Sequence, residues 1–249
     1  MKKILLASTV AAAFVLGFSS CKKETENNPP TPKNEAPSSF VPGDADFFFK
    51  ASVFYVSTTS VYGQSSEYKV GDALAFFKNN KVNAGDVTIN GLPMTKEESG
   101  NYIYKKLGNI PEGITYLSNL AAWTATGDTA TGVAPLSIND TTAFPAKPVI
   151  QDKKINTQES FLLTAKDTII ADSTVFVVSG PNATLRKVKG PNAKSCTFTK
   201  EEMQTLGTGR SLGLIQISPY TTVLDTTVIS GAKTYFQKQT ITAKYVDLE

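Results

Sequence analysis

Histidine is absent from the 249-residue chain. Its absence excludes Ser-His-Asp and Cys-His catalytic arrangements, histidine-containing zinc sites and a histidine-based pH switch. Only two cysteines occur, Cys21 and Cys196. If Cys21 is consumed by a modification, no disulfide can form within the chain. Cys196 lies in the alternating stretch "SCTFT", so we expect a buried structural thiol rather than a nucleophile.

A strong net charge is also absent. The formal charge is +3, but Lys2 and Lys3 belong to an N-terminal leader without acidic residues. The chain from residue 21 onward carries 23 basic and 22 acidic residues. The densest basic stretch, "LRKVKGPNAK" at 185–194, is interpreted as a solvated turn. A basic footprint for nucleic acid is therefore lacking, and we expect no nucleic-acid partner.

No apolar run is long enough to span a bilayer as a helix. The longest, Ile4–Leu16, has 13 residues, whereas a hydrocarbon core of about 30 Å needs about 20. With Lys2-Lys3 before it and small residues after it, the run is typical of a secretory signal sequence. Residues 1–20 are therefore interpreted as a signal peptide.

The end of this leader, "GFSSC", resembles the lipobox of bacterial lipoproteins. Ser19, Ser20 and Cys21 match, whereas Phe18 stands where the family usually has leucine. The resemblance implies that Cys21 is acylated and becomes the new N-terminus. Several acyl chains, at about 0.8 kcal/mol per buried methylene, would anchor the protein stably. An ordinary signal peptide cut near an unrelated cysteine is the alternative.

Resemblance to Gram-negative lipoproteins also bears on location. Lys22, not aspartate, follows the cysteine, so the resemblance implies the outer membrane, with the periplasmic face and the cell surface both open. Residues 22–43, "KKETENNPPTPKNEAPSSFVPG", contain five prolines and few apolar residues. Such a segment buries too little surface to fold, so residues 21–43 are expected to be a lipidated cysteine and a disordered tether.

From Asp44 onward the apolar residues recur with a period of two. In "DFFFKASVFYVS", one face of a strand collects Phe47, Phe49, Ala51, Val53 and Tyr55. Similar segments follow, separated by Gly, Asn, Asp and Pro, including an Asn90-Gly91 turn. The pattern predicts an all-β protein.

Helical signals are scarce. The best is 199–207, with Thr199 as the N-cap, Glu202 at the third helical position and Gly207 at the end. The stretch "GDALAFFKNN" at 71–80 fits a short helix or a strand.

A proline-rich stretch, "FPAKPVIQDKK" at 144–154, divides the strand-bearing region into two parts of about 100 residues, the size of an immunoglobulin-like sandwich. We predict two antiparallel β-sandwich (immunoglobulin-like) domains at 44–146 and 147–249, with one larger sandwich as the alternative.

Short motifs in this region resemble uncharacterised Bacteroidetes-type outer-membrane lipoproteins. They lie at Trp123–Gly127, Phe144-Pro145, Ala171–Gly180 and Tyr235-Phe236. The resemblance covers about half of the chain and implies architecture and compartment, but no catalytic residue.

Candidate chemistry is sparse. Two carboxylates suffice for glycoside hydrolysis, but the adjacent pairs Glu97-Glu98 and Glu201-Glu202 lie in turn or helix-start contexts. Trp123 is the candidate for stacking on a ligand, with core packing as the alternative.

Five Asp-(Ser/Thr) dipeptides, each followed by Ala, Thr or Ile, resemble the O-glycosylation sequon of Bacteroidetes exported proteins. An alternative is that such pairs mark turns. The resemblance implies acceptor hydroxyls at Thr129, Thr141, Thr168, Ser173 and Thr226.

We therefore expect a lipid-anchored envelope protein with a non-enzymatic binding or scaffolding role, without a cofactor or a metal. Its expected partners are the membrane, through the lipid, and a glycan or an envelope protein. The alternatives are an accessory polysaccharide-binding lipoprotein and a carboxylate-based glycoside hydrolase.

Overall fold

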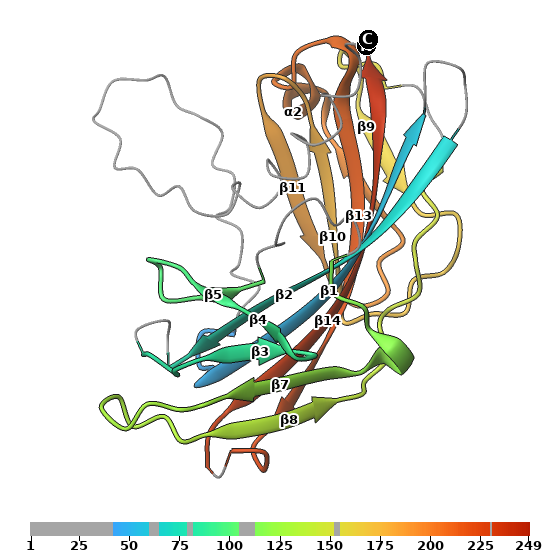
Figure 1. Cartoon of the computed structure of the whole chain (residues 1–249). Coiled ribbons are helices and arrows are strands. Elements are labelled where there is room, and N and C mark those ends of the chain that lie inside the picture. The colour runs from blue at the N-terminus through green and yellow to red at the C-terminus, as the bar shows by residue number, and fades with distance from the viewer. Residues whose placement is uncertain (1–41, 60–64, 79–81, 105–112, 152–154, 230) are drawn as a thin grey trace, which may run out of the picture.

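The computed structural model describes residues 42–59, 65–78, 82–104, 113–151, 155–229 and 231–249. The expected signal peptide, Cys21 and all but the last two residues of the expected tether lie outside these ranges. Strands dominate the described residues, which confirms the all-β prediction (Figure 1). No helix in this part of the chain combines the length and apolar character needed to cross a membrane.

One long twisted sheet forms the body of the protein. Its strand order is β11-β10-β13-β14-β1-β2-β6-β5. In that order the strands are Thr184–Lys189, Ser173–Ser179, Gly209–Asp225, Thr234–Leu248, Phe47–Thr59, Ser65–Phe77, Tyr102–Ile103 and Thr95–Lys96.

Two smaller sheets and two short helices complete the described part of the fold. The four-stranded sheet has the order β4 (Leu92–Pro93), β3 (Val87–Ile89), β7 (Ala121–Ala125) and β8 (Leu136–Asp140). The two-stranded sheet pairs β12 (Ser195–Phe198) with β9 (Phe161–Thr164). The helices are the 3-10 turn η2 (Leu117–Asn119) and α2 (Lys200–Gln204).

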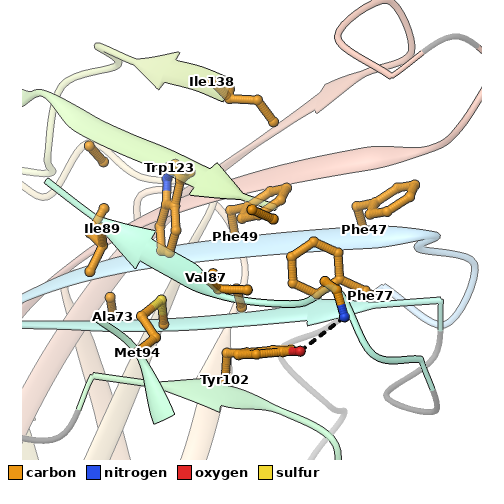
Figure 2. Packing of buried hydrophobic residues seen from close by; sticks show 14 of the residues in the cluster. Phe47, Phe49, Ala73, Phe77, Val87, Ile89, Met94, Tyr102, Trp123 and Ile138 are labelled. Carbon is orange, nitrogen blue, oxygen red and sulfur yellow. Dashed lines mark hydrogen bonds between the residues drawn. The ribbon is translucent and has the colours of Figure 1, made fainter. Parts of the chain in front are cut away.

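The first hydrophobic core lies between the long sheet and the four-stranded sheet. Phe47, Phe49 and Ala51 are buried on one face of β1, as the alternation predicted. Trp123 from β7 and Phe236 from β14 pack against the same aromatic cluster, and Figure 2 shows Trp123 beside Phe49. Burying each large aromatic side chain contributes about 1.5–3 kcal/mol.

The second core lies at the other end of the long sheet, on the same face. Phe176 of β10 pairs with Ile217 of β13, and Ile217 pairs with Thr242 of β14. Paired residues share a face of the sheet, so Phe176, Ile217 and Thr242 lie on the same face. Thr242 is an even number of residues from Phe236 along β14, so the two cores lie on the same face of the sheet. Strands β9 and β12 and helix α2 also contribute residues to this core, among them Phe198 and Met203.

The division into two sandwich domains is not confirmed. Strands from both predicted domains share the long sheet, and β1 pairs with β14 in parallel over Phe47–Ser57. The buried residues of the two cores separate along the chain, except for Phe236, which joins the core of the first half together with the half-buried Ile229 and Ala232 from between β13 and β14.

Several local predictions are confirmed. Asn90 and Gly91 both have positive φ and connect β3 to β4, as a hairpin turn requires. Thr199 and Glu202 form the reciprocal capping box of α2. The ambiguous stretch 71–80 is a strand through Phe77, as part of β2.

The basic stretch 185–194 is not simply a turn, contrary to the prediction. Its first half belongs to β11, the outermost strand of the long sheet. Charged side chains on an edge strand discourage pairing with another chain, which explains why a strand there carries Arg186, Lys187 and Lys189.

Candidate functional site

The face of the long sheet opposite the two cores carries a group of polar side chains. Neighbouring strands align Asp72, Ser52, Gln239, Tyr220 and Ser173 in one row across five strands. A second row aligns Lys50, Gln237 and Thr222. Because paired residues in a sheet point to the same face, these eight residues form one surface, which we call the polar band.

The centre of the polar band is buried. Ser52 is 2% exposed, Gln239 3% and Gln237 0%. The side-chain amide of Gln237 donates to the hydroxyl of Thr222 at 3.2 Å. The amide oxygen Oε1 of Gln239 has no hydrogen-bond partner among the residues that the structure describes. Leaving such an atom unsatisfied costs about 1–3 kcal/mol, so a ligand that donates a hydrogen bond there would gain affinity.

Two opposite charges belong to the band, Lys50 and Asp72. Part of each side chain reaches the surface, but dense packing desolvates the charged ends. Burial lowers the pKa of Lys50 to about 8, an effect that the charge of Asp72 opposes. Burial also raises the pKa of Asp72 to about 6, opposed by the N–H of Ala73 and by Lys50. Desolvated, coupled charges of this kind occur more often at functional sites than elsewhere.

A second cation, Arg186, acts on the same region. Arg186 lies on β11, which three strands separate from β1, yet its charge further lowers the pKa of Lys50. The long sheet between these two strands is strongly twisted (Figure 1). Burial lowers the pKa of Arg186 itself. Among these three side chains, two are cationic and one is anionic.

Sequence reasoning missed the polar band. Its signal was present, since Lys50 and Ser52 alternate with Phe49 and Ala51, and Gln237 and Gln239 alternate in β14. Such alternation is typical of a strand face that meets water. Only the folded structure shows that Ser52, Gln237 and Gln239 are buried together.

Trp123 does not occupy a position from which it could stack on a ligand. Its side chain is 1% exposed, and its ring centroid lies 5.2 Å from that of Phe49 inside the first core (Figure 2). Within the described part of the chain, the indole Nε1 has no hydrogen-bond partner. The alternative of core packing accounts for this residue.

The five proposed O-glycosylation acceptors lie in two kinds of place. Ser173 is half-buried within β10, at one end of the polar band. The other four acceptors are exposed and lie outside strands, at Thr129, Thr141, Thr168 and Thr226.

In three of the five Asp-(Ser/Thr) dipeptides, the aspartate also stabilises a turn. The carboxylates of Asp128, Asp140 and Asp225 each accept the backbone N–H two residues later. This is the Asx-turn role that explains Asp-Thr pairs without glycans. The exposure of the neighbouring hydroxyls is compatible with both interpretations.

The adjacent glutamates do not converge on a cleft. Glu202 accepts from the N–H of Thr199 and from Nζ of Lys187, both at 2.7 Å, so it serves the helix cap and an ion pair. Glu201 is exposed in the first turn of α2. Glu97 and Glu98 lie in the turn between β5 and β6.

A surface pocket with a volume of about 360 Å³ lies beside the loop that contains Thr129. Its polar walls are occupied by internal hydrogen bonds: Asp128 accepts from the side-chain amide of Asn83 at 2.8 Å, and Asn83 accepts from the hydroxyl of Tyr102 at 2.8 Å. These contacts rigidify the loop, so the polar band is the stronger candidate.

Cys196 is buried, as predicted, and burial raises the pKa of its thiol. A raised pKa keeps the thiol protonated and poorly nucleophilic. In the described ranges, no three acidic or sulfur side chains come together to hold a metal ion.

Comparisons of the chain with protein-family models, with curated proteins and with solved structures find no match.

Proposed function

We propose that this chain is a lipid-anchored cell-envelope protein that binds a polar ligand, without catalysis, at the polar band. The single observation that carries the binding role is the unsatisfied Oε1 of Gln239, 3% exposed and set in a row between Ser52 and Tyr220. An apolar residue there would avoid the cost of a buried, unpaired acceptor. Retaining glutamine is consistent with a ligand that supplies the missing donor.

The chemistry of the band favours a glycan as the ligand. Amides, hydroxyls and a phenol are the groups that bind sugar hydroxyls, and the band carries Gln237, Gln239, Ser52 and Tyr220. Lys50 adds a cation that suits an acidic sugar. This observation supports the second candidate function, an accessory polysaccharide-binding lipoprotein. The band carries one carboxylate, Asp72, which does not supply the pair that glycoside hydrolysis needs.

The binding proposal is tested with Gln239→Leu and the matched control Gln204→Leu, which changes an exposed glutamine on α2. Both proteins are made with Cys21→Ala, so that they are released as soluble forms, and are applied to a glycan array and to an envelope pull-down. We expect Q239L to lose binding at least tenfold and to remain as stable as the parent, since leucine removes the unpaired acceptor. Unchanged binding by Q239L would refute the role of the band.

Anchoring is proposed from the sequence alone. Replacing Cys21 with alanine removes the acceptor of the acyl chains, and we expect the protein to move from the outer-membrane fraction to the soluble fraction. Labelling with a palmitate analogue should be lost at the same time. Retention of the unlabelled variant in the membrane fraction would contradict the anchor.

The five Asp-(Ser/Thr) sites remain proposed O-glycosylation sites. Exposure of Thr129, Thr141, Thr168 and Thr226 supports access by a transferase. The intact mass of the exported protein tests this proposal. A mass equal to that of the peptide plus lipid would leave the turn interpretation alone.

The two cores on one sheet support, as a proposal, two packing units near 44–146 and 147–249.

A further inference from the structure

A lysine and an aspartate are buried together where the four-stranded sheet meets the long sheet. Lys238 lies on β14, between Phe236 and Thr240 on the face of the first core, and Asp140 ends β8. Their side chains are 1% and 5% exposed, and Nζ of Lys238 lies 3.2 Å from Oδ2 of Asp140. Such burial is costly for an ion pair, so this pair calls for an explanation beyond surface electrostatics.

The surroundings hold the amine of Lys238 in one orientation. Nζ also donates to the backbone oxygens of Asn119 at 2.8 Å and Asp140 at 3.3 Å. It lies 4.7 Å from the ring centroid of Phe144 and 5.7 Å from that of Tyr116. Burial lowers the pKa of Lys238, which the charge of Asp140 opposes. Two protons are thus held by carbonyl oxygens, and the third faces the carboxylate.

The other carboxylate oxygen of Asp140 is bound by two donors. Oδ1 accepts the N–H of Thr142 at 2.9 Å and the hydroxyl of Thr142 at 2.6 Å. Two donors on one carboxyl oxygen polarise the carbonyl and stabilise negative charge that develops there, as in an oxyanion hole. Oδ2, which faces the amine, is the oxygen in position to leave.

We propose that Lys238 and Asp140 condense into an intramolecular amide bond that joins β14 to β8. Nζ passes the proton that faces Oδ2 to that oxygen, which leaves a lone pair on Nζ directed at the carboxyl group. The lone pair attacks Cγ, and the negative charge moves to Oδ1, where the two donors of Thr142 stabilise it. The electron pair on Oδ1 then re-forms the Cγ=Oδ1 double bond and the Cγ–Oδ2 bond breaks. Nζ gives a second proton to Oδ2, which departs as water.

The reaction is balanced without a co-reactant. An ammonium and a carboxylate become a secondary amide and one water, with no change in oxidation state. The product removes both buried charges and ties together two residues 98 positions apart. This inference is independent of the polar band, because it concerns the opposite face of the long sheet.

The test is a mass measurement on the denatured full chain, followed by trypsin digestion. After allowance for loss of the leader, the lipid and any glycan, we expect a mass lower than the calculated one by one water, no tryptic cleavage after Lys238, and a branched fragment that contains both residues. Lys238→Arg and Asp140→Ala should show the unmodified mass, and Asp140→Asn should lose ammonia instead of water.

The ion pair of Lys187 and Glu202 is the internal control. It is shorter, at 2.7 Å, but the two side chains are 26% and 23% exposed, and we expect trypsin to cleave after Lys187. A wild-type chain with the full mass and normal cleavage after Lys238 would overturn the proposal and leave a non-covalent ion pair. Because this readout needs only the wild-type chain, it remains decisive even if a variant fails to fold.

Discussion

The aromatic rings of Phe49 and Phe236 stack, with their centroids 5.5 Å apart and an interplanar angle of 15°. The two residues are also direct neighbours in the parallel pair of β1 and β14. The first core, into which β1 packs, is therefore complete only when β14, the last strand of the chain, is in place. The first core depends on residues from both halves of the sequence.

Replacing Phe236 with alanine tests this dependence. The variant loses the stacked contact and leaves a cavity beside Phe49, and we expect the free energy of unfolding to fall by about 3–5 kcal/mol. Denaturant titration followed by circular dichroism measures it. Val223→Ala, at a residue 43% exposed on the neighbouring β13, is the control and should cost less than about 1 kcal/mol. A small effect of F236A would mean that the first half packs without β14.

Gly71 is predicted to tolerate no side chain. It forms a bridge with Gly113, and its carbonyl accepts the N–H of Ile114 at 3.0 Å. A Cβ at position 71 would lie 1.9 Å from the backbone oxygen of Ile114. Because the clash is with backbone, we expect Gly71→Ala to cost about 3 kcal/mol or more in thermal or chemical unfolding. Gly190→Ala, with open space around it, should leave stability nearly unchanged.

The charges of the polar band should give stability a specific pH dependence. The pKa of Asp72 is raised to about 6, whereas an unfolded aspartate has a pKa of about 3.9. Between about pH 4 and 6 the unfolded chain releases this proton first, so the contribution of Asp72 to the free energy of unfolding falls as pH rises.

Lys50 affects the free energy of unfolding at higher pH. Its pKa is lowered to about 8, against about 10.4 when unfolded, so the unfolded chain holds more protons between these values and stability rises with pH there. Unfolding measured from pH 4 to 10 for wild type, Asp72→Asn and the exposed control Asp86→Asn tests both windows. D72N should remove the fall between pH 4 and 6, whereas D86N should retain it. Identical profiles for wild type and D72N would contradict the burial of this carboxyl.

Trp123 offers a direct optical test because it is the one tryptophan in the chain. At 1% exposure its fluorescence should be blue-shifted, should resist quenching by acrylamide and should shift to the red on unfolding. Addition of a glycan that binds the polar band should leave this signal nearly unchanged, since Trp123 lies on the opposite side of the sheet. Strong acrylamide quenching of the folded protein would place the indole at the surface.

The local features of this protein follow from its sequence. Alternation along residues 46–57 predicted the buried face of β1, Asn90-Gly91 predicted a hairpin, and Thr199 with Glu202 predicted the capped helix α2. Each of these signals is carried by residues close together in the chain, where backbone dihedrals and side-chain periodicity decide the outcome. The absence of histidine is also a property of the sequence itself, and the proposed leader and lipid anchor at Cys21 rest on the sequence alone.

The tertiary structure decided the rest. The parallel pairing of β1 with β14 has no local signature, because it depends on contacts between segments at opposite ends of the described chain. The same pairing merges strands of two expected domains into one sheet. Tertiary packing buries Gln239 and desolvates the charged ends of Lys50 and Asp72, although their alternation resembles a face exposed to water. Packing between the sheets likewise brings Lys238 to Asp140, because proximity in space depends on the whole fold.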